Sequence, residues 1–486
     1  MNQGMFHEAM NMIGVFDLPV LVVVENNLYG EFTHLERHSA VPELYKRAEA
    51  YDIESSRLDG NNVKEVSEKV GNIINSMRRD GKPRMVELMT YRWHGHMEGD
   101  QELYRDEAEK EQYKKQDPIP RLEKEMIESN SVTADEITAI KKAAIDEVKE
   151  AVLFAGKSPA PGLSELLDDV YTPENEIYFK GSMMQSGSGE QKEVSVAQAI
   201  NEAIAEEMEN DNGVFLWGED VSLGGYFNVT EGLIDRFGKD RIIDTPISEY
   251  GIVGGAVGAA MTGMRPISEI LFGDFLTCCM DPIVNQAAKL RYMTGGQVSI
   301  PLTIRTPLGS GIGMAAQHSQ AMEKFFLGVP GLIVVAPSDS YTAKGLLKSA
   351  IRVNNPVIFF EHKLLYAESG KIPVGEYTLP IGKAVIRQKG EDVTIVTHLL
   401  GVGVSLEAAN QLRNEGVNVE VIDLCTLYPM DNETILNSVK KTGRLVTVEE
   451  GPYTGGIGAE VVARCTTAGF SLLKSAPLRI AAPECP

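Results

Sequence analysis

The sequence has few cysteines, an excess of acidic over basic residues and no long hydrophobic run. No uninterrupted apolar stretch in its 486 residues approaches the ~18 residues that a membrane span requires, so we expect a soluble protein. Lys and Arg number 46 against 69 Asp and Glu, and the net charge of −23 argues against nucleic acid or an anionic membrane as partner. The five cysteines show no metal-ligand spacing, which favours a reducing cytoplasm over a disulfide framework. We expect all five to be small buried residues: Cys278, Cys279, Cys425, Cys465 and Cys485.

Alternating strand and helix patterns fill most of the chain, and its hydrophobic content of 43% is ample for about three domains. This alternation predicts an α/β fold built on parallel sheets. The patterns predict helices over residues 62–79 and 195–209, a capped helix from Thr133, and strands over 84–90, 214–217, 393–396, 419–422 and 444–448. The predicted domains are residues 1–170, 193–369 and 370–486, with a polar linker over 171–192.

An unbroken apolar run near the N-terminus, Pro19 to Val24, predicts a central parallel strand buried on both faces. Its carboxyl end would bring Asn27 and Tyr29 to the rim where open α/β sheets bind ligands. A side-chain oxygen of Asn27 and the backbone oxygen of Tyr29 would suit Mg²⁺, which still needs a carboxylate. Without its neighbours, the pair Asn26-Asn27 is more simply a turn.

With its neighbours, the stretch from Asn2-Gln3-Gly4 to Gly30 resembles the α subunit of the thiamine-dependent first component of 2-oxo acid and acetoin dehydrogenase complexes. In that family an Asp ligand of magnesium precedes the Asn-Gln-Gly. The sequence begins after that position and ends at Pro486, before a further segment of the relatives, so we expect a partial gene product.

From Val194 onward the chain closely resembles the β subunit of the same enzymes. The matching stretches are 218–220, 244–249, 285–289, 315–320 and 456–460. The resemblance implies a fusion of α and β parts, with thiamine-diphosphate-binding parallel-sheet domains followed by a transketolase C-terminal-like α/β domain. It also implies thiamine diphosphate and Mg²⁺ as cofactors, a lipoyl-bearing acyltransferase as partner, and an oligomer.

Four residues of the β-like part take roles from this resemblance. Glu249 would hydrogen-bond the aminopyrimidine ring of the cofactor, and His318 would help to bind and protonate the substrate or accept the acyl-carrying partner. Phe275 would pack against the aminopyrimidine, and Glu219 would lie near the cofactor. The plainer alternatives are a solvated Glu249 behind an N-cap Ser248, a structural His318 and a core Phe275.

In the α-like part, Arg92 and His96 follow a predicted strand, and a paired Arg and His suit the oxygens of a diphosphate. A loop histidine that caps a helix is the alternative for His96. The neighbouring Met97 stands where many animal pyruvate enzymes have a phosphorylatable Ser, so phosphorylation there is excluded. The stretch 93–100 looks more like the acetoin-type branch than the pyruvate-type branch.

The implied reaction is cleavage of acetoin, or decarboxylation of a 2-oxo acid such as pyruvate, with transfer of the acyl unit to a lipoyl group. Catalysis would fall to Glu249, His318 and His96, cofactor binding to Asn27, Tyr29, Arg92, Glu219 and Phe275, and metal binding to Asn27 and Tyr29. Two other functions stay open. One is a transketolase-like transferase, because such enzymes share the domain order, and the other is a catalytically silent assembly subunit.

Overall fold

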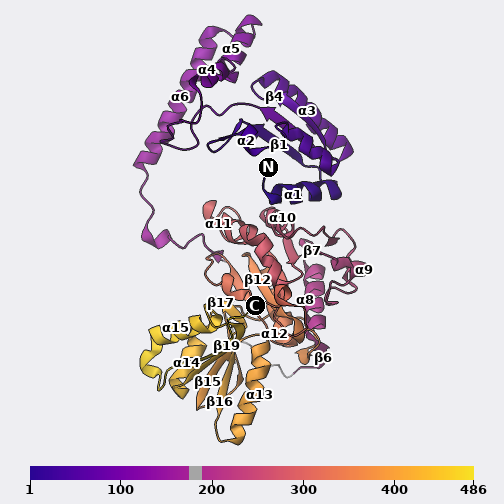
Figure 1. Cartoon of the computed structure of the whole chain (residues 1–486), viewed down its shortest axis with the longest axis vertical. Helices are drawn as coiled ribbons and strands as arrows, with labels where there is room; N and C mark the ends of the chain where they lie inside the picture. Colours follow the sequence, from indigo (N-terminus) through magenta and orange to yellow (C-terminus); the bar gives the residue numbers. More distant parts are fainter. Residues whose placement is uncertain (174–188, 486) are drawn as a thin grey trace. The chain divides into compact units, whose positions relative to one another are not determined.

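The computed structural model describes residues 1–173 and 189–485, and the chain divides into two compact units, Met1–Gly162 and Leu163–Pro486 (Figure 1). Most of the predicted linker, residues 174–188, lies outside the described residues. The start of the predicted linker is packed on the second unit. The Tyr171 hydroxyl donates to the Leu332 carbonyl at 3.1 Å, and the Thr172 amide donates to Asn355 Oδ1 at 3.1 Å.

The first unit is built on a three-stranded parallel sheet in the order β1-β5-β4. Its strands and longer helices are α1 (Gly4–Val15), β1 (Leu21–Asn26), β2 (Tyr29–Gly30), β3 (Thr33–His34), α2 (Leu35–His38), β4 (Glu54–Asp59), α3 (Val63–Asp80), β5 (Arg84–Met89), α4 (Glu107–Lys114), α5 (Pro118–Glu128) and α6 (Ala134–Lys157). The strand predicted from Pro19 exists, but its predicted burial on both faces is wrong. β1 ends the order of this sheet, and Val23 is 47% exposed. An apolar run shows that a strand can be buried but not where the strand lies in the sheet.

The predicted helices of the first unit form with the expected caps. Asn62 accepts the Glu65 amide at the start of α3, and Thr133 and Glu136 form a reciprocal capping box at the start of α6. The apolar residues that predicted α6 are not covered within the described residues, since Ile140, Val148 and Val152 are each 64–65% exposed. The apolar periodicity therefore predicted the helix correctly, but the apolar face of α6 is exposed and does not pack on the core of this unit.

The second unit holds a seven-stranded sheet in the order β17-β11-β12-β10-β9-β7-β8. From residue 191 to residue 362 the strands and α-helices are β6 (Gln191–Ser195), α8 (Val196–Asn210), β7 (Val214–Gly218), α9 (Leu233–Phe237), β8 (Ile242–Asp244), α10 (Glu249–Met261), β9 (Arg265–Glu269), α11 (Leu290–Met293), β10 (Thr303–Leu308), β11 (Ile333–Val335), α12 (Ser340–Arg352) and β12 (Val357–His362). All of its neighbouring strands are parallel except β11 and β17. The predicted α/β fold with parallel sheets is confirmed.

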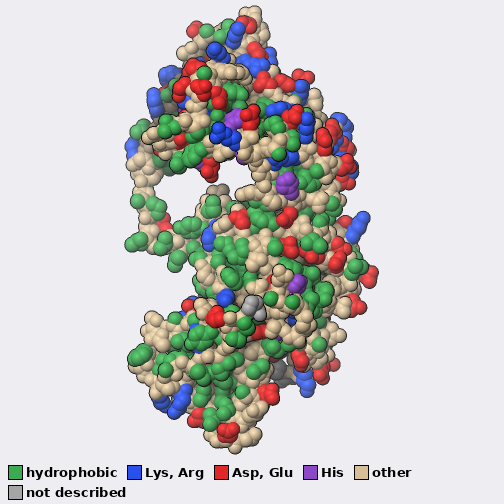
Figure 2. Space-filling view, in the orientation of Figure 1, with side chains coloured by type: hydrophobic (Ala, Val, Ile, Leu, Met, Phe, Trp, Pro, Cys, Tyr) green, Lys and Arg blue, Asp and Glu red, His purple; other side chains and the backbone are tan. Residues whose placement is uncertain are grey.

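A five-stranded sheet, in the order β14-β16-β15-β18-β19, follows in the same unit. Its region contains β13 (Ser369–Pro373), β14 (Val385–Gln388), β15 (Val393–Thr397), α13 (Leu400–Asn414), β16 (Val419–Asp423), β17 (Thr426–Tyr428), α14 (Asn432–Thr442), β18 (Leu445–Pro452), α15 (Ile457–Gly469) and β19 (Leu478–Ala482). Because β17 pairs with β11, this region adds an antiparallel strand to the seven-stranded sheet. Its outer strands expose Ile386, Leu478 and Ile480, and Figure 2 shows apolar side chains gathered over this region.

The cysteines were predicted to be buried, and no membrane-spanning segment was expected. Cys279, Cys425 and Cys465 are buried as predicted, but Cys278 and Cys485 are exposed, so the prediction of five buried cysteines is wrong for these two. Cys278 lies in a tight 3₁₀ segment that turns it outward beside the buried Cys279. Among the described residues, no helix combines the length and apolarity needed to cross a membrane.

Candidate functional site

In the first unit, Asn27 and Tyr29 follow the carboxyl end of β1 and line a cavity of about 190 Å³ together with Asn2, Glu25 and His38. Asn27 Oδ1 accepts the Tyr29 amide at 3.0 Å in a local turn. That bond leaves one lone pair of the oxygen available. Among the described residues, no group of three or more His, Cys, Asp or Glu could hold a metal. Asn27, Tyr29 and Glu25 line the same cavity, which makes their oxygens candidate ligands of a cation.

Arg92 and His96 follow β5, which lies next to β1 in the sheet. The Arg92 guanidinium donates to the Glu31 carbonyl at 2.7 Å and to the Tyr104 hydroxyl at 2.6 Å, while its Nε is buried without a partner among the described residues. His96 is exposed, and its amide donates to Asp100 at 2.8 Å. Arg92 thus keeps one unsatisfied donor, and the His96 ring stays accessible at the same edge.

The Tyr29 hydroxyl lies against a carboxylate that sequence reasoning did not find. It donates to Glu109 of α4 at 3.0 Å, and the Tyr91 hydroxyl donates to the same carboxylate at 3.0 Å. Burial first, and then the hydrogen bond to Glu109, raise the pKa of Tyr29 well above its usual range. These bonds fix the Tyr29 ring and leave its backbone oxygen as the group that could reach a cation.

In the second unit, the carboxyl ends of β12, β10, β9, β7 and β8 lie along one edge because these strands are parallel neighbours. Ligands of open parallel sheets bind at this kind of edge. Glu219 directly follows β7, Phe275 follows β9, and His318 lies beyond the glycine-rich loop that follows β10. Glu249 is the first residue of α10, which follows β8. The structure therefore brings the four residues predicted in this half to one side of the sheet.

Two of these residues form an acidic pair. Glu219 is buried, and burial, followed by the charges of Glu249, Asp220 and Glu269, raises the pKa of Glu219 to about 7. Glu249 is half-buried at the helix start, where Ser248 does not cap it. Ser248 occupies the N-cap position of α10, but its hydroxyl donates to the Ile247 carbonyl at 2.7 Å and caps no backbone amide. A carboxyl that is half protonated near neutral pH beside a second carboxyl can hold and release a proton.

A buried cluster of one arginine and two glutamates on neighbouring strands affects the charge near Glu219. Arg305 of β10 binds Glu361 of β12 through two hydrogen bonds, at 2.9 and 2.6 Å, and it also binds Glu269 at the end of β9. Burial raises the pKa of Glu269, and the Arg305 charge opposes that effect. Glu269 in turn acts on Glu219, so the charge environment of Glu219 depends on two neighbouring strands.

His318 lies between two aromatic rings. Its ring centroid is 4.7 Å from that of Phe272 and 5.3 Å from that of Phe275, both in edge-to-face geometry. The Lys363 ammonium donates to the backbone oxygen of His318 and lies 5.1 Å from the Phe272 ring. The predicted pair Phe275 and His318 is therefore in contact, and Phe272 and Lys363 are neighbours that sequence reasoning missed. The position of Lys363 immediately after β12 was the signal that could have found it.

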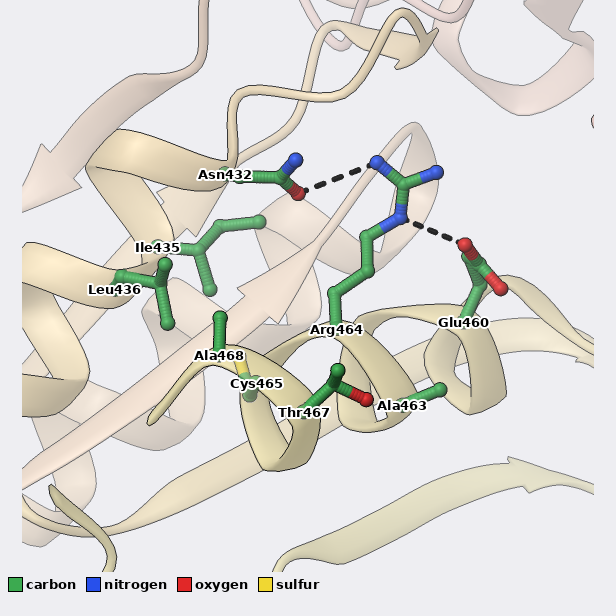
Figure 3. Close-up of a pocket in the computed structure, with 9 residues that line it drawn as sticks. All are labelled: Asn432, Ile435, Leu436, Glu460, Ala463, Arg464, Cys465, Thr467 and Ala468. Atoms are coloured by element: carbon green, nitrogen blue, oxygen red, sulfur yellow. Dashed lines mark hydrogen bonds and ion pairs between the residues drawn. The ribbon is translucent and has the colours of Figure 1, made fainter. Parts of the chain in front are cut away.

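A mostly apolar groove lies elsewhere in the second unit. It runs between α14 and α15, encloses about 350 Å³, and is shown in Figure 3 with Ile435, Leu436, Cys465 and Ala468 on its walls. Its cation, Arg464, is paired with Glu460 at 2.7 Å. The groove contains none of the predicted site residues and offers no free charge for a diphosphate, so we do not assign the cofactor to it.

Comparison with known proteins identifies the family. Residues 1–164 match the family description "Dehydrogenase E1 component", residues 192–368 match "Transketolase, pyrimidine binding domain", and residues 382–486 match "Transketolase, C-terminal domain". The β subunit of acetoin:2,6-dichlorophenolindophenol oxidoreductase from Bacillus subtilis is 44% identical over 306 residues, covering 60% of this chain and 90% of that subunit. The chain belongs to the thiamine-diphosphate-dependent E1 dehydrogenase family.

Other E1 relatives act in different dehydrogenases. The 2-oxoisovalerate dehydrogenase subunit beta of Bacillus subtilis is 44% identical over 295 residues, covering 60% of this chain and 90% of that subunit. The pyruvate dehydrogenase E1 component subunit beta of Rhizobium meliloti is 45% identical over 295 residues, covering 60% of this chain and 64% of that subunit. These matches lie on one E1 β-like region, and the N-terminal match adds an E1 α-like region to the same chain, as the resemblance implied.

The residues of this E1 chain fit parts of thiamine diphosphate. Phe272 and Phe275 provide aromatic surface at the same edge of the sheet as the half-buried Glu249 and the buried Glu219. In the first unit, the unsatisfied Nε of Arg92 suits a phosphate oxygen. The second unit therefore has the groups for a heteroaromatic ring and the first unit the groups for an anion.

Proposed function

We propose that this E1 chain cleaves acetoin or decarboxylates a small 2-oxo acid, and that it transfers the resulting acyl unit to a lipoyl group of a partner acyltransferase. The acidic pair of Glu219 and Glu249 is the observation that carries this proposal. The raised pKa of Glu219, to about 7, supports proton exchange in this site near neutral pH. The relatives named for acetoin, pyruvate and 2-oxoisovalerate support the substrate class.

Each residue of the β-like half has a stated role in this proposal. Bound thiamine diphosphate supplies a stabilised carbanion at its C2 atom. Glu249 would hold the aminopyrimidine ring nitrogen by a hydrogen bond, and its charge helps to raise the pKa of Glu219. Phe275 packs on the ring, and His318 faces the substrate and donates a proton through an imidazole nitrogen. The aromatic neighbours of His318 exclude water from one side of its ring.

In the α-like half, Arg92 and His96 bind the diphosphate, and Asn27 and Tyr29 bind Mg²⁺ through a side-chain and a backbone oxygen. Glu25 lines the same cavity as Asn27 and provides the carboxylate that Mg²⁺ usually takes. These two proposals share one edge of the three-stranded sheet, where β1 and β5 are neighbours.

Isothermal titration with thiamine diphosphate and Mg²⁺ tests the cofactor sites. We expect Mg²⁺-dependent binding that Asn27→Ala weakens at least tenfold and that Asn27→Asp retains, because Asp keeps the oxygen and its turn. Asn75→Ala, on the exposed face of α3, is the matched control. Binding by the wild-type chain that is equally tight without Mg²⁺ would exclude the metal assignment. No binding at all would favour the catalytically silent subunit.

Reduction of 2,6-dichlorophenolindophenol with acetoin, pyruvate and 2-oxoisovalerate as separate substrates tests the reaction. We expect turnover of at least one of them, and loss of more than 100-fold in Glu249→Gln, since Gln cannot exchange a proton with the ring. Acyl transfer to a free lipoyl domain tests the partner. Turnover of sugar phosphates without any lipoyl acceptor would support the transketolase-like alternative and contradict the proposal.

Assembly is part of the same proposal. We infer an oligomer because the relatives are named as subunits. Sedimentation at several protein concentrations measures it directly. A monomer at all concentrations that still turns over substrate would contradict this inference and leave the reaction assignment intact.

A further inference from the structure

A short segment that carries His318 is held at both ends by buried charges. The Lys363 ammonium donates to the backbone oxygen of His318. Two residues later, Asp274 Oδ1 accepts the backbone amide of Gln320 at 3.2 Å and its side-chain amide at 2.9 Å. Lys363 follows β12, and Asp274 follows β9, so the two charges reach the segment from different strands.

Both charged side chains are buried, and the loss of their hydration has to be offset by other interactions. Lys363 is 5% exposed and Asp274 is 4% exposed. Burial lowers the pKa of the Lys363 ammonium, and the charges of Asp274 and then Glu450 oppose this shift. Burying charges costs several kcal/mol unless they are paired, and well-packed apolar residues are often as stable or more stable. Asp274 Oδ2 is buried without a hydrogen-bond partner among the described residues, so stability alone does not explain these two buried charges.

The ammonium also touches the aromatic wall of His318. Lys363 Nζ lies 5.1 Å from the centroid of the Phe272 ring, and that ring contacts the imidazole of His318 edge to face. A cation over a ring face is an attractive contact that holds both groups in place. Lys363 therefore contacts the backbone of His318 directly and its imidazole ring indirectly, through Phe272.

We propose that Lys363 and Asp274 are positioning residues that fix the main chain on the two sides of Ser319 and thereby orient the His318 ring against Phe272 and Phe275. This inference rests on the proposed function of His318. The His318 carbonyl belongs to the peptide group before Ser319 and the Gln320 amide to the peptide group after it, so neither of these two groups can rotate without breaking a charge-assisted hydrogen bond. Orientation of a catalytic group by such contacts accelerates a reaction through geometry.

Hydrogen exchange of the peptide that covers residues 315–322 tests the positioning directly. We expect Lys363→Met to accelerate exchange there at least tenfold, and Lys363→Arg, which keeps a charged donor, to change it less than twofold. Lys371→Met, on the exposed side of β13, is the matched control and should leave exchange unchanged. Wild-type exchange in a folded Lys363→Met variant would overturn the inference. If that variant does not fold, Asp274→Asn provides the same test, with threefold faster exchange expected and unchanged exchange contradicting it.

A double-mutant cycle tests whether the effect passes through His318. We expect Lys363→Met to lower kcat/KM at least 30-fold in the wild-type background and less than threefold in the His318→Ala background. Equal losses in both backgrounds would show that Lys363 acts independently and would overturn the inference. If His318→Ala alone keeps wild-type activity, the proposed role of His318 fails, and the exchange data still report whether the segment is held.

Discussion

The Nε2 atom of His362 lies 2.7 Å from the Oε2 atom of Glu450, and this contact joins the last strand before the C-terminal region to β18 within that region. The other carboxylate oxygen of Glu450 accepts the Ser310 amide at 2.6 Å and its hydroxyl at 2.7 Å. Glu450 therefore also holds the glycine-rich loop that precedes His318.

The first prediction concerns the acid stability that Glu450 contributes. Burial alone would raise the pKa of Glu450, but hydrogen bonds from His362 and Ser310 lower it to about 2. A lowered carboxyl pKa stabilises the folded state above the usual value of 4.5, and this contribution is lost as the pH falls from 4.5 towards 2. We expect Glu450→Ala to cost about 1–3 kcal/mol at pH 7, because it leaves buried donors unpaired.

Urea unfolding of the wild type and Glu450→Ala at pH 7, 5 and 4 measures this contribution. The difference between the two free energies of unfolding should be the same at pH 7 and pH 5 and should start to shrink at pH 4. A difference that grows on acidification would contradict the assigned sign.

The second prediction concerns a loop glycine. Gly309 has φ +90°, and a Cβ atom there would overlap the His362 ring and lie 2.9 Å from Glu450 Oε2. Gly313 in the same loop has φ +73° and open space around its Cβ position. We expect Gly309→Ala to cost about 3 kcal/mol or more, and Gly313→Ala only the 1–2 kcal/mol of a left-handed backbone. Thermal unfolding of both variants compares the two costs, and equal costs would show that the ring and carboxylate move aside freely.

The sequence predicted the backbone of this region better than its electrostatics. Strand runs located the ends after which Glu219 and Asn27 follow, because the carboxyl edge of a parallel sheet is determined by local pattern and chain direction. The strand that precedes Phe275, β9, was not among the predicted strands. The raised pKa of Glu219 could not be predicted, since it depends first on burial and then on the charges of Glu249, Asp220 and Glu269, which only the fold brings near it.

The prediction of a central strand near the N-terminus was wrong because strand pairing between distant residues decides a strand's place in the sheet. The run from Pro19 to Val24 has the composition of a central strand, yet β1 ends the order of its sheet. Position in a sheet is set by which strands pair, and a single strand's composition does not contain that information. Lys363 was missed for the same reason, because its significance comes from His318, 45 residues away.

The third prediction concerns Glu219. A carboxyl with a raised pKa destabilises the folded state as the pH rises from the usual value of 4.5 through about 7. We expect Glu219→Gln to be more stable than the wild type by about 1–2 kcal/mol at pH 8 and equal to it at pH 4.5. Glu231→Gln, an exposed substitution in the loop before α9, is the control and should show no such trend. If Glu219→Gln is less stable than the wild type at pH 8, the fold stabilises the ionised Glu219 carboxylate, and the assigned direction of its pKa shift is wrong.

The fourth prediction concerns Arg305, whose side chain is buried together with Glu269 and Glu361. Removing one member of a buried ion pair leaves a charge uncompensated and typically costs 3–5 kcal/mol, so we expect a cost of about this size for Arg305→Met at pH 7. The cost should be smaller at pH 5, because burial raises the pKa of Glu269 and a proton can then neutralise this carboxylate. Arg236→Met removes an exposed pair with Glu209 and should cost less than about 1 kcal/mol. Urea unfolding at both pH values separates the two cases. A cost for Arg305→Met that does not fall on acidification would mean that lost packing of the arginine, and not the two carboxylates, determines the effect.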